Sequence, residues 1–178
     1  MEESARFCLI RDKQTAKVRF LMENWNDVYL THIHEIETDV DENRRKIHRV
    51  KCLGDDCIAC KQGKRIYTKI YVPLYNETLQ KFQYWERSPA SHFINFDNIF
   101  NAHMDIPYFR FEIKRIGHKG DLQTKYEITK IEETNDPLPG DKMPSLVGNF
   151  YGVVDESTMK QYLEKEDEIY KDRYMEGA

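Results

Sequence analysis

Three of the four cysteines lie close together, at Cys52, Cys57 and Cys60. The CxxC spacing of the last two, after a third thiol and a turn of glycine and aspartates, suits a tetrahedral Zn²⁺ with sulfur ligands about 2.3 Å from the metal. A disulfide would leave one of these thiols unpaired, so we predict one structural zinc ion per chain. Such a site contributes folding energy rather than chemistry. Cys8, far upstream, is expected to be a small buried hydrophobe.

The fourth zinc ligand must come from an element that lies beside the cysteines. Residues 28–52 predict a β-hairpin, because both halves are rich in β-branched side chains and the residues between them, 39–43, are polar. If this hairpin turns about Glu42, His32 lies directly across from Cys52, and cross-strand Cβ atoms are about 5 Å apart. The predicted metal ligands are therefore His32, Cys52, Cys57 and Cys60.

Two other histidines compete with His32 for this place. His34 serves equally if the centre of the turn moves by one residue. His48 is nearest to the cysteines in sequence, but the residues that separate it from Cys52 span about 13 Å in a strand, too far for one metal unless the strand bends. The order of preference is His32, then His34, then His48.

A second kind of chemistry is predicted for the strand over residues 66–74. Its even positions are apolar and suit a core, whereas its odd positions are Tyr67, Lys69 and Tyr71. Two aromatic rings that flank a lysine on a solvent-facing side are unusual without a ligand. Single-stranded nucleic acid stacks its bases on such rings while cations hold its backbone.

The next strand, residues 81–87, decides whether Trp85 joins this face. If the connection over residues 75–80 has an odd number of loop residues, Phe82 and Tyr84 face the core and Trp85 is exposed beside Tyr67, Lys69 and Tyr71. The other register buries Trp85, since a shift of one residue exchanges the two faces of a strand.

The charge of the chain is unevenly distributed. Between Asp41 and Ile70 there are nine Lys and Arg residues against four Asp and Glu, whereas from Asp155 onward there are eight acids against four bases. A basic middle with an acidic end indicates a polyanion-binding body with a polar tail. The predicted nucleic-acid contacts are Arg44, Arg45, Lys46, Lys61, Lys64, Arg65, Tyr67, Lys69, Tyr71, Trp85 and Arg87.

The remaining segments complete a mainly β fold. Alternating apolar residues predict strands over residues 16–21, 108–116 and 124–131, and an apolar stripe predicts one internal helix from Ser88 to Asn101. Asp155 can cap a C-terminal helix, whose apolar stripe is Met159, Tyr162, Leu163, Ile169 and Tyr170.

This order of elements predicts an OB-fold-like Greek-key barrel. We expect a body over residues 1–154, which includes a zinc-knuckle subdomain at about 32–60, and an acidic helix or tail over 155–178. No apolar run approaches the length of a membrane span, and the first residues lack the pattern of a signal peptide, so a cytoplasmic protein without membrane contact is expected.

The chain resembles the zinc-containing single-stranded-DNA-binding proteins of tailed phages, including the T-even type. The resemblance covers about residues 16–131 and rests on the order of Ala16–Leu21, a strand histidine, the cysteine knuckle and the aromatic-basic strand. Three further segments look like later strands of the smaller phage relatives: Val72–Tyr75, Tyr84–Arg87 and Phe111–Arg115. The chain lacks the basic N-terminal segment that this family uses for cooperative self-association.

The resemblance implies a protein that coats and protects single-stranded DNA during phage replication or recombination, in the cytoplasm of a bacterial host. In that family the histidine ligand lies on the strand before the hairpin turn, which favours His32 or His34 over His48. Replication or recombination proteins are expected partners of the acidic C-terminus. Two alternatives remain: a zinc-knuckle module that binds a protein of a replication or packaging complex, and an RNA-binding OB protein.

Enzymatic activity is not expected. The sequence has no Walker-type glycine loop and no Ser/His/Asp arrangement. A zinc nuclease would need an open metal position, and no paired carboxylates or further histidines are placed to open such a catalytic site.

Overall fold

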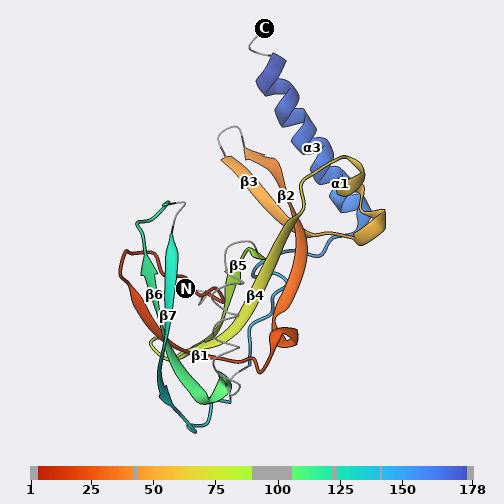
Figure 1. Ribbon diagram of the computed structural model, residues 1–178. Coiled ribbons are helices and arrows are strands. Elements are labelled where there is room, and N and C mark those ends of the chain that lie inside the picture. The colour runs from red at the N-terminus through yellow and green to blue at the C-terminus, as the bar shows by residue number, and fades with distance from the viewer. Residues whose placement is uncertain (1–3, 42–43, 90–105, 122–123, 141, 176–178) are drawn as a thin grey trace. The chain divides into compact units, whose positions relative to one another are not determined.

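The computed structural model describes residues 4–41, 44–89, 106–121, 124–140 and 142–175 (Figure 1). The strands are β1 (Thr15–Phe20), β2 (Tyr29–Asp41), β3 (Arg44–Lys51), β4 (Tyr67–Asn76), β5 (Lys81–Arg87), β6 (Phe109–Ile116) and β7 (Lys125–Glu133). The helices are α1 (Ile58–Lys61) and α3 (Glu156–Met175), with short 3-10 turns η1 (Trp25–Asp27), η2 (Gly54–Asp56) and η3 (Ile106–Tyr108). The internal helix expected over residues 88–101 falls almost wholly outside the described residues.

The mainly β fold is confirmed, with seven strands in an antiparallel sheet of order β3-β2-β4-β1-β6-β7, in which β5 also pairs with β4. This non-sequential order is compatible with the Greek-key connections expected from the sequence. The chain forms two compact units. Unit 1 comprises Met1–Leu30 and Ile70–Ser145, and unit 2 comprises Thr31–Lys69 and Leu146–Ala178. No helix among the described residues has the length and apolar character needed to cross a membrane.

The core of unit 1 forms where β1 pairs with both β4 and β6. Apolar residues at alternate positions of β1 and β6 face inward, as the period of a strand requires. Val18, Phe20, Phe111 and Ile113 are all at most 1% exposed. The rings of Phe20 and Phe111 pack with their centroids 5.2 Å apart.

The β4–β5 hairpin has the register that buries Trp85. Asn76 pairs with Lys81, so the turn is Glu77–Gln80, and Val72 pairs with Trp85. This even-numbered connection places the indole beside Val72 in the core, where it is 3% exposed. The alternative register considered from the sequence is therefore confirmed.

Unit 2 is built on the β2–β3 hairpin. Ile33 pairs with Lys51 and His34 with Val50, and the next pair along the ladder joins His32 and Cys52, because the Cys52 amide donates to the His32 carbonyl oxygen at 2.9 Å. The register predicted from a turn about Glu42 is thus confirmed. An irregularity between Asp39 and Asp41 shifts the pairing only near the turn.

Helix α3 covers the other side of the cysteine segment in unit 2, as Figure 1 shows beside α1. Asp155 caps the helix, since its carboxylate accepts the Thr158 amide at 2.7 Å. Met159 and Leu163 are fully buried in one apolar cluster with Cys57 and with residues of β2 and β3. The boundary expected at residue 155 therefore does not separate a detached tail from a body.

Candidate metal centre and nucleic-acid surface

Four side chains in unit 2 converge on one point. The Nε2 atom of His34 lies 3.4 Å from the sulfur of Cys57 and 3.5 Å from that of Cys60. The sulfurs of Cys52 and Cys60 are 3.5 Å apart, and all four candidate ligand atoms lie within 4.8 Å of one another. The cluster is therefore compatible with a single metal ion.

The spacing of these atoms fits a tetrahedral site. With metal–sulfur bonds of about 2.3 Å and a metal–nitrogen bond of about 2.0–2.1 Å, tetrahedral geometry places sulfurs about 3.8 Å apart and sulfur and nitrogen about 3.6 Å apart. The separations of 3.4–3.5 Å for three of the six atom pairs are only slightly shorter, and the remaining pairs lie within 4.8 Å. A disulfide is excluded, because its sulfurs would lie about 2.0 Å apart, whereas all four cysteines are free.

The cysteine segment reaches this geometry through two tight turns. Gly54 adopts a φ of 82°, a conformation that costs other residues more, and its carbonyl accepts the Cys57 amide at 3.1 Å. The short helix α1 follows, and Gly63 ends it with a φ of 74° while its amide bonds to the Cys60 carbonyl at 2.9 Å. These turns hold both CxxC sulfurs on the side that faces β2.

The histidine of this cluster is His34 and not the predicted His32, although the register behind the prediction was right. His32 and His34 lie on the same face of β2, two residues apart. The cysteine segment folds back over His34, which is 0% exposed. His32 stays exposed, and its Nδ1 atom instead contacts the Thr68 hydroxyl at 2.9 Å. The backbone pairing of His32 with Cys52 therefore does not bring the His32 side chain into the cluster.

The other candidates lie outside the cluster. The His48 ring stacks on Tyr162 of α3 with 4.1 Å between centroids, and its Nε2 atom contacts the Thr38 hydroxyl at 2.8 Å. Burial, with the nearby charges of Lys46 and Lys165, lowers the pKa of His48. Cys8 is exposed in unit 1, contrary to the expectation that it is buried.

A hydrogen bond fixes which nitrogen of His34 faces the sulfurs. The Nδ1 atom lies 3.0 Å from the carbonyl oxygen of Arg65, which can only accept, so Nδ1 carries the proton. The Nε2 lone pair is then directed at the cysteines. This is the outer contact that commonly orients histidine ligands of metals, and it ties the metal cluster to the residues that lead into β4.

The thiols differ in their readiness to ionise. Burial raises the pKa of Cys60 to about 12, and hydrogen bonds with Cys52 and Cys57 act in the same direction. Burial also raises the pKa of Cys57, but backbone hydrogen bonds with Leu53, Cys60 and Ala59 outweigh it, so the pKa lies below its ordinary value. Because these cysteines would bind a cation as thiolates, its binding would release protons and would weaken as the pH falls.

Two residues of α3 support the centre and were not assigned this role from the sequence. The Met159 sulfur lies 3.7 Å from the Cys57 sulfur and covers it on the helix side. A carboxylate oxygen of Glu166 accepts the Glu37 amide of β2 at 2.8 Å, while Lys64 lies 2.6 Å from the other oxygen. The signal was present in the sequence, because Glu166 follows Met159 by seven residues and so falls on the same helical stripe.

Two predicted stacking residues are not available at the surface. Tyr71 is 0% exposed and Trp85 3% exposed, and both belong to unit 1. The Arg87 guanidinium packs against the rings of both Trp85 and Tyr126, at 4.3 Å and 3.9 Å from their centroids. Burial lowers the pKa of Arg87, and Tyr126 opposes the shift. These residues stabilise the core of unit 1, so we withdraw Tyr71 and Trp85 as base-stacking residues.

Several predicted basic contacts already have acidic partners. Lys64 approaches Glu166 at 2.6 Å and Asp167 at 3.7 Å. Burial lowers the pKa of Lys64, but these carboxylates outweigh it and leave the pKa above its ordinary value. Lys61 likewise pairs with Asp56 at 3.2 Å, and Arg45 pairs with Glu37 at 3.5 Å. Lys46 is exposed, and the side chain of Arg44 lies outside the described residues.

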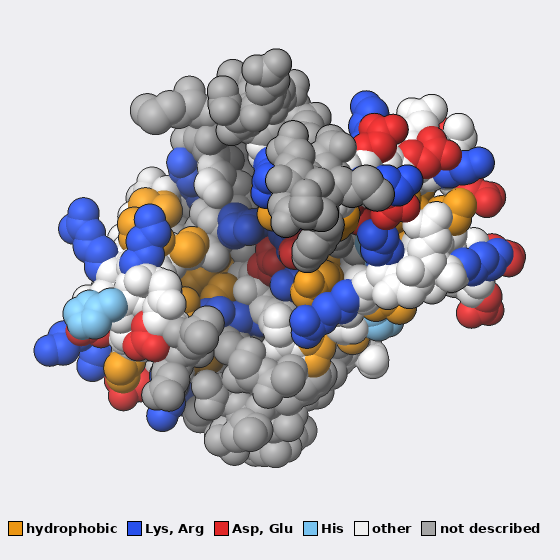
Figure 2. Space-filling view, turned by 90° about the horizontal axis from the view of Figure 1, so that it is seen from above, with side chains coloured by type: hydrophobic (Ala, Val, Ile, Leu, Met, Phe, Trp, Pro, Cys, Tyr) orange, Lys and Arg blue, Asp and Glu red, His pale blue; other side chains and the backbone are white. Residues whose placement is uncertain are grey.

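Three residues of the predicted nucleic-acid surface do lie together in unit 2. The Tyr67 ring is partly exposed, with the Arg65 guanidinium carbon 4.9 Å and the Lys69 ammonium 5.7 Å from its centroid. Tyr67 and Lys69 occupy alternate positions of β4 and so share one face of the strand, whereas Arg65 lies in the segment just before it. On the face drawn in Figure 2, Lys and Arg side chains are interspersed with Asp and Glu rather than gathered into one patch.

Comparison with known proteins finds no family model and no curated protein that matches this chain.

Proposed function

We propose that the protein binds single-stranded DNA with little sequence preference, using the cation-flanked ring of Tyr67 in unit 2. The observation that carries the proposal is the contact of this partly exposed ring with Arg65 and Lys69. An unpaired base can stack on the ring or on the guanidinium plane, while the two cations neutralise phosphates. Duplex DNA keeps its bases stacked inside and cannot make the first of these contacts.

We further propose that the ion of the metal cluster is Zn²⁺. Three thiolates and one imidazole are a donor set of structural zinc sites. With four protein ligands the tetrahedron around the ion would be complete, which would leave no position for a substrate or a reactive water. This supports a binding role rather than catalysis by the metal.

The metal cluster supports the proposed DNA surface through one short connection. His34 contacts the Arg65 carbonyl at 3.0 Å, and Arg65 is two residues before Tyr67. The Lys64 amide also donates to the Ala59 carbonyl at 2.9 Å, within the cysteine segment. Zinc would thereby fix the backbone that presents the ring, and less conformational entropy would be lost when DNA binds.

The setting in phage replication or recombination is supported by the resemblance of the segment order, and a role in coating and protecting the strand follows from the same resemblance. The alternatives predict different ligands: an RNA-binding protein would prefer RNA of the same sequence, and a protein-interaction module would bind no nucleic acid. Titration with fluorescent oligo-dT, the RNA equivalent and a duplex of equal length separates these cases.

Tyr67→Ala is expected to weaken oligo-dT binding roughly tenfold, because one stacked base contributes about 1–3 kcal/mol. Tyr67→Phe should keep most of the affinity, since the ring rather than the hydroxyl makes the contact. The slope of log K against log salt should not change for either variant. Lys69→Gln should instead flatten this slope by about 0.7, the loss of one phosphate contact on a single strand.

The matched control is Tyr108→Ala in unit 1, which removes a ring that is 56% exposed but has no place in the proposed surface. Its affinity should equal that of the parent. Folded Tyr67→Ala protein that binds like the parent would show that the surface is wrongly placed. Equal affinity of the parent for duplex and single strand would refute the function itself.

A further inference from the structure

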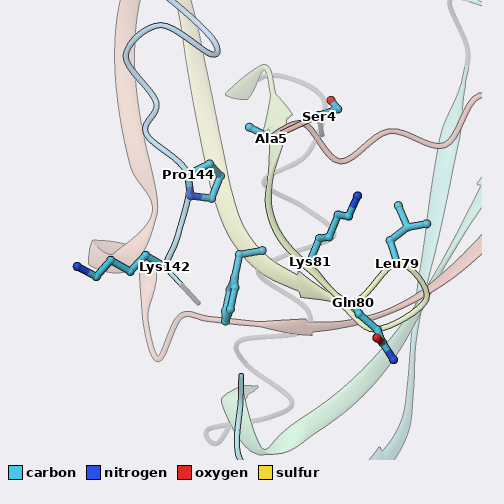
Figure 3. Close-up of a pocket in the computed structure, with 8 residues that line it drawn as sticks. Ser4, Ala5, Leu79, Gln80, Lys81, Lys142 and Pro144 are labelled. Carbon is cyan, nitrogen blue, oxygen red and sulfur yellow. The ribbon is translucent and has the colours of Figure 1, made fainter. Parts of the chain in front are cut away.

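A cavity of about 450 Å³ lies in unit 1 at the turn between β4 and β5 (Figure 3). Its walls come from the turn and the start of β5, from Ser4 and Ala5, and from Lys142 and Pro144. Figure 3 shows Lys142 and Pro144 on one side and Leu79 on the other. The volume is within the range of about 300–1,000 Å³ that is usual for small-molecule sites.

Buried amide side chains fix the shape of this cavity. Asn76 accepts the Leu79 amide at 3.2 Å and donates to the Gln83 side chain at 2.9 Å. Gln83 in turn donates to the carbonyl oxygens of Ser4 and Arg6, at 2.9 and 3.1 Å. Asn76 and Gln83 are only 3% and 4% exposed. This chain of hydrogen bonds joins the turn to the N-terminal segment, so the cavity is formed before any ligand arrives.

The backbone of the turn is held in an uncommon conformation. Gln80 has a φ of 55°, in the left-handed region that glycine or asparagine usually occupies. Beside it, Leu79 is 56% exposed at the rim of the cavity. A left-handed residue without a glycine here indicates that the surrounding structure determines the turn, which keeps Lys81 and Phe82 at fixed positions.

Among the described residues that line the cavity there are two lysines and one aromatic ring but no carboxylate. In Figure 3 the Lys81 side chain extends toward Ser4, whereas the Lys142 side chain points away from the cavity. Phe82 is partly exposed, and its ring packs against that of Tyr75 with 5.1 Å between centroids. A ligand that suits this lining has a planar ring and a negative charge.

We propose that this cavity binds a nucleotide, with the base against Phe82 and the phosphate at Lys81. The choice of a nucleotide of single-stranded DNA rests on the proposed function, which needs only the surface of unit 2. Because Tyr67 belongs to unit 2, the protein then has two separate nucleotide contacts.

The test uses ¹⁵N-labelled full-length protein and three probes: thymidine monophosphate, thymidine and inorganic phosphate. Thymidine monophosphate should shift the amide signals of Gln80, Lys81 and Phe82 and bind more tightly than either part alone. Lys81→Gln and Phe82→Leu should each weaken this binding about tenfold, the loss expected for one stacked base or one charge contact. Lys142→Gln is the matched control and should change affinity much less, since its side chain points away.

A second measurement, by crosslinking, tests whether single-stranded DNA reaches the cavity. Oligo-dT that carries 5-iododeoxyuridine should crosslink to Phe82 in the parent and in Tyr67→Ala protein. Crosslinks confined to unit 2, with oligo-dT still bound, would refute the cavity site and leave the proposed function intact. If oligo-dT does not bind but thymidine monophosphate still shifts these signals, the proposed function fails and the cavity site stands. If inorganic phosphate binds as tightly as thymidine monophosphate, and Phe82→Leu does not change this binding, the cavity is only an anion site and the proposal is overturned.

Discussion

Protein with His34→Ala is expected to lose bound zinc and to unfold in unit 2, whereas His32→Ala protein keeps one zinc per chain. His34 is fully buried with its Nε2 atom 3.4–3.5 Å from two ligand sulfurs, while His32 is exposed. Binding of structural zinc contributes about 10–16 kcal/mol in zinc-finger peptides, so the loss of one of four ligands should strongly lower the stability of this unit.

Metal analysis after gel filtration in reducing, chelator-free buffer measures the zinc content, and thermal unfolding measures the stability. Cys57→Ser should behave like His34→Ala, and Cys8→Ser, which removes an exposed thiol, should behave like the parent. Zinc that survives His34→Ala but is lost from His32→Ala would contradict the assignment. Parent protein without zinc under these conditions would contradict the identity of the ion.

The second large effect is expected from the C-terminal helix. Truncation before Asp155 should destabilise unit 2 and weaken metal binding, because it uncovers Cys57 and the apolar cluster that Met159 and Leu163 complete. This differs from the polar tail that the acidic composition indicates. Met159→Ala alone should cost about 2–5 kcal/mol, as for other buried methionines.

Denaturant unfolding with a tryptophan-independent probe, such as far-ultraviolet circular dichroism, measures these changes. Lys160→Ala is the control on the same helix, because this side chain is 60% exposed and its contact with Glu164 is a surface ion pair 3.9 Å long. A truncated chain with unchanged zinc affinity and stability would show that α3 is an independent tail after all.

The hairpin shows how far local rules lead. The polar turn about Glu42 correctly predicted the register that places Cys52 across from His32. It could not predict the ligand, because the direction in which the cysteine segment folds back depends on its packing against α3, a helix far away in sequence. His32 and His34 lie two residues apart on one face of the strand, so the position at which the cysteine segment folds back decides which of them joins the cluster.

The prediction of an exposed aromatic face on β4 was wrong for a different reason. Alternation assumes that one face of a strand meets solvent, yet β4 is an interior strand of the sheet, and its central residues are buried on both faces. Tyr71 is therefore part of the core, whereas Tyr67, the first residue of the strand, is partly exposed. Whether Trp85 is buried depends on whether the turn between β4 and β5 has an odd or an even number of residues. The alternation of apolar residues in the strands does not give that number.

Unit 2 is assembled from two stretches of chain that most of unit 1 separates. On a ribosome that adds about 5–20 residues per second, the hairpin and cysteines emerge several seconds before α3 is synthesised. During that interval Ile36 and Val50 lack the helix that covers them in the finished protein. A metal that arrives early would hold the nascent cysteine segment over this apolar surface, and so protect it from association with other unfinished chains until the helix docks.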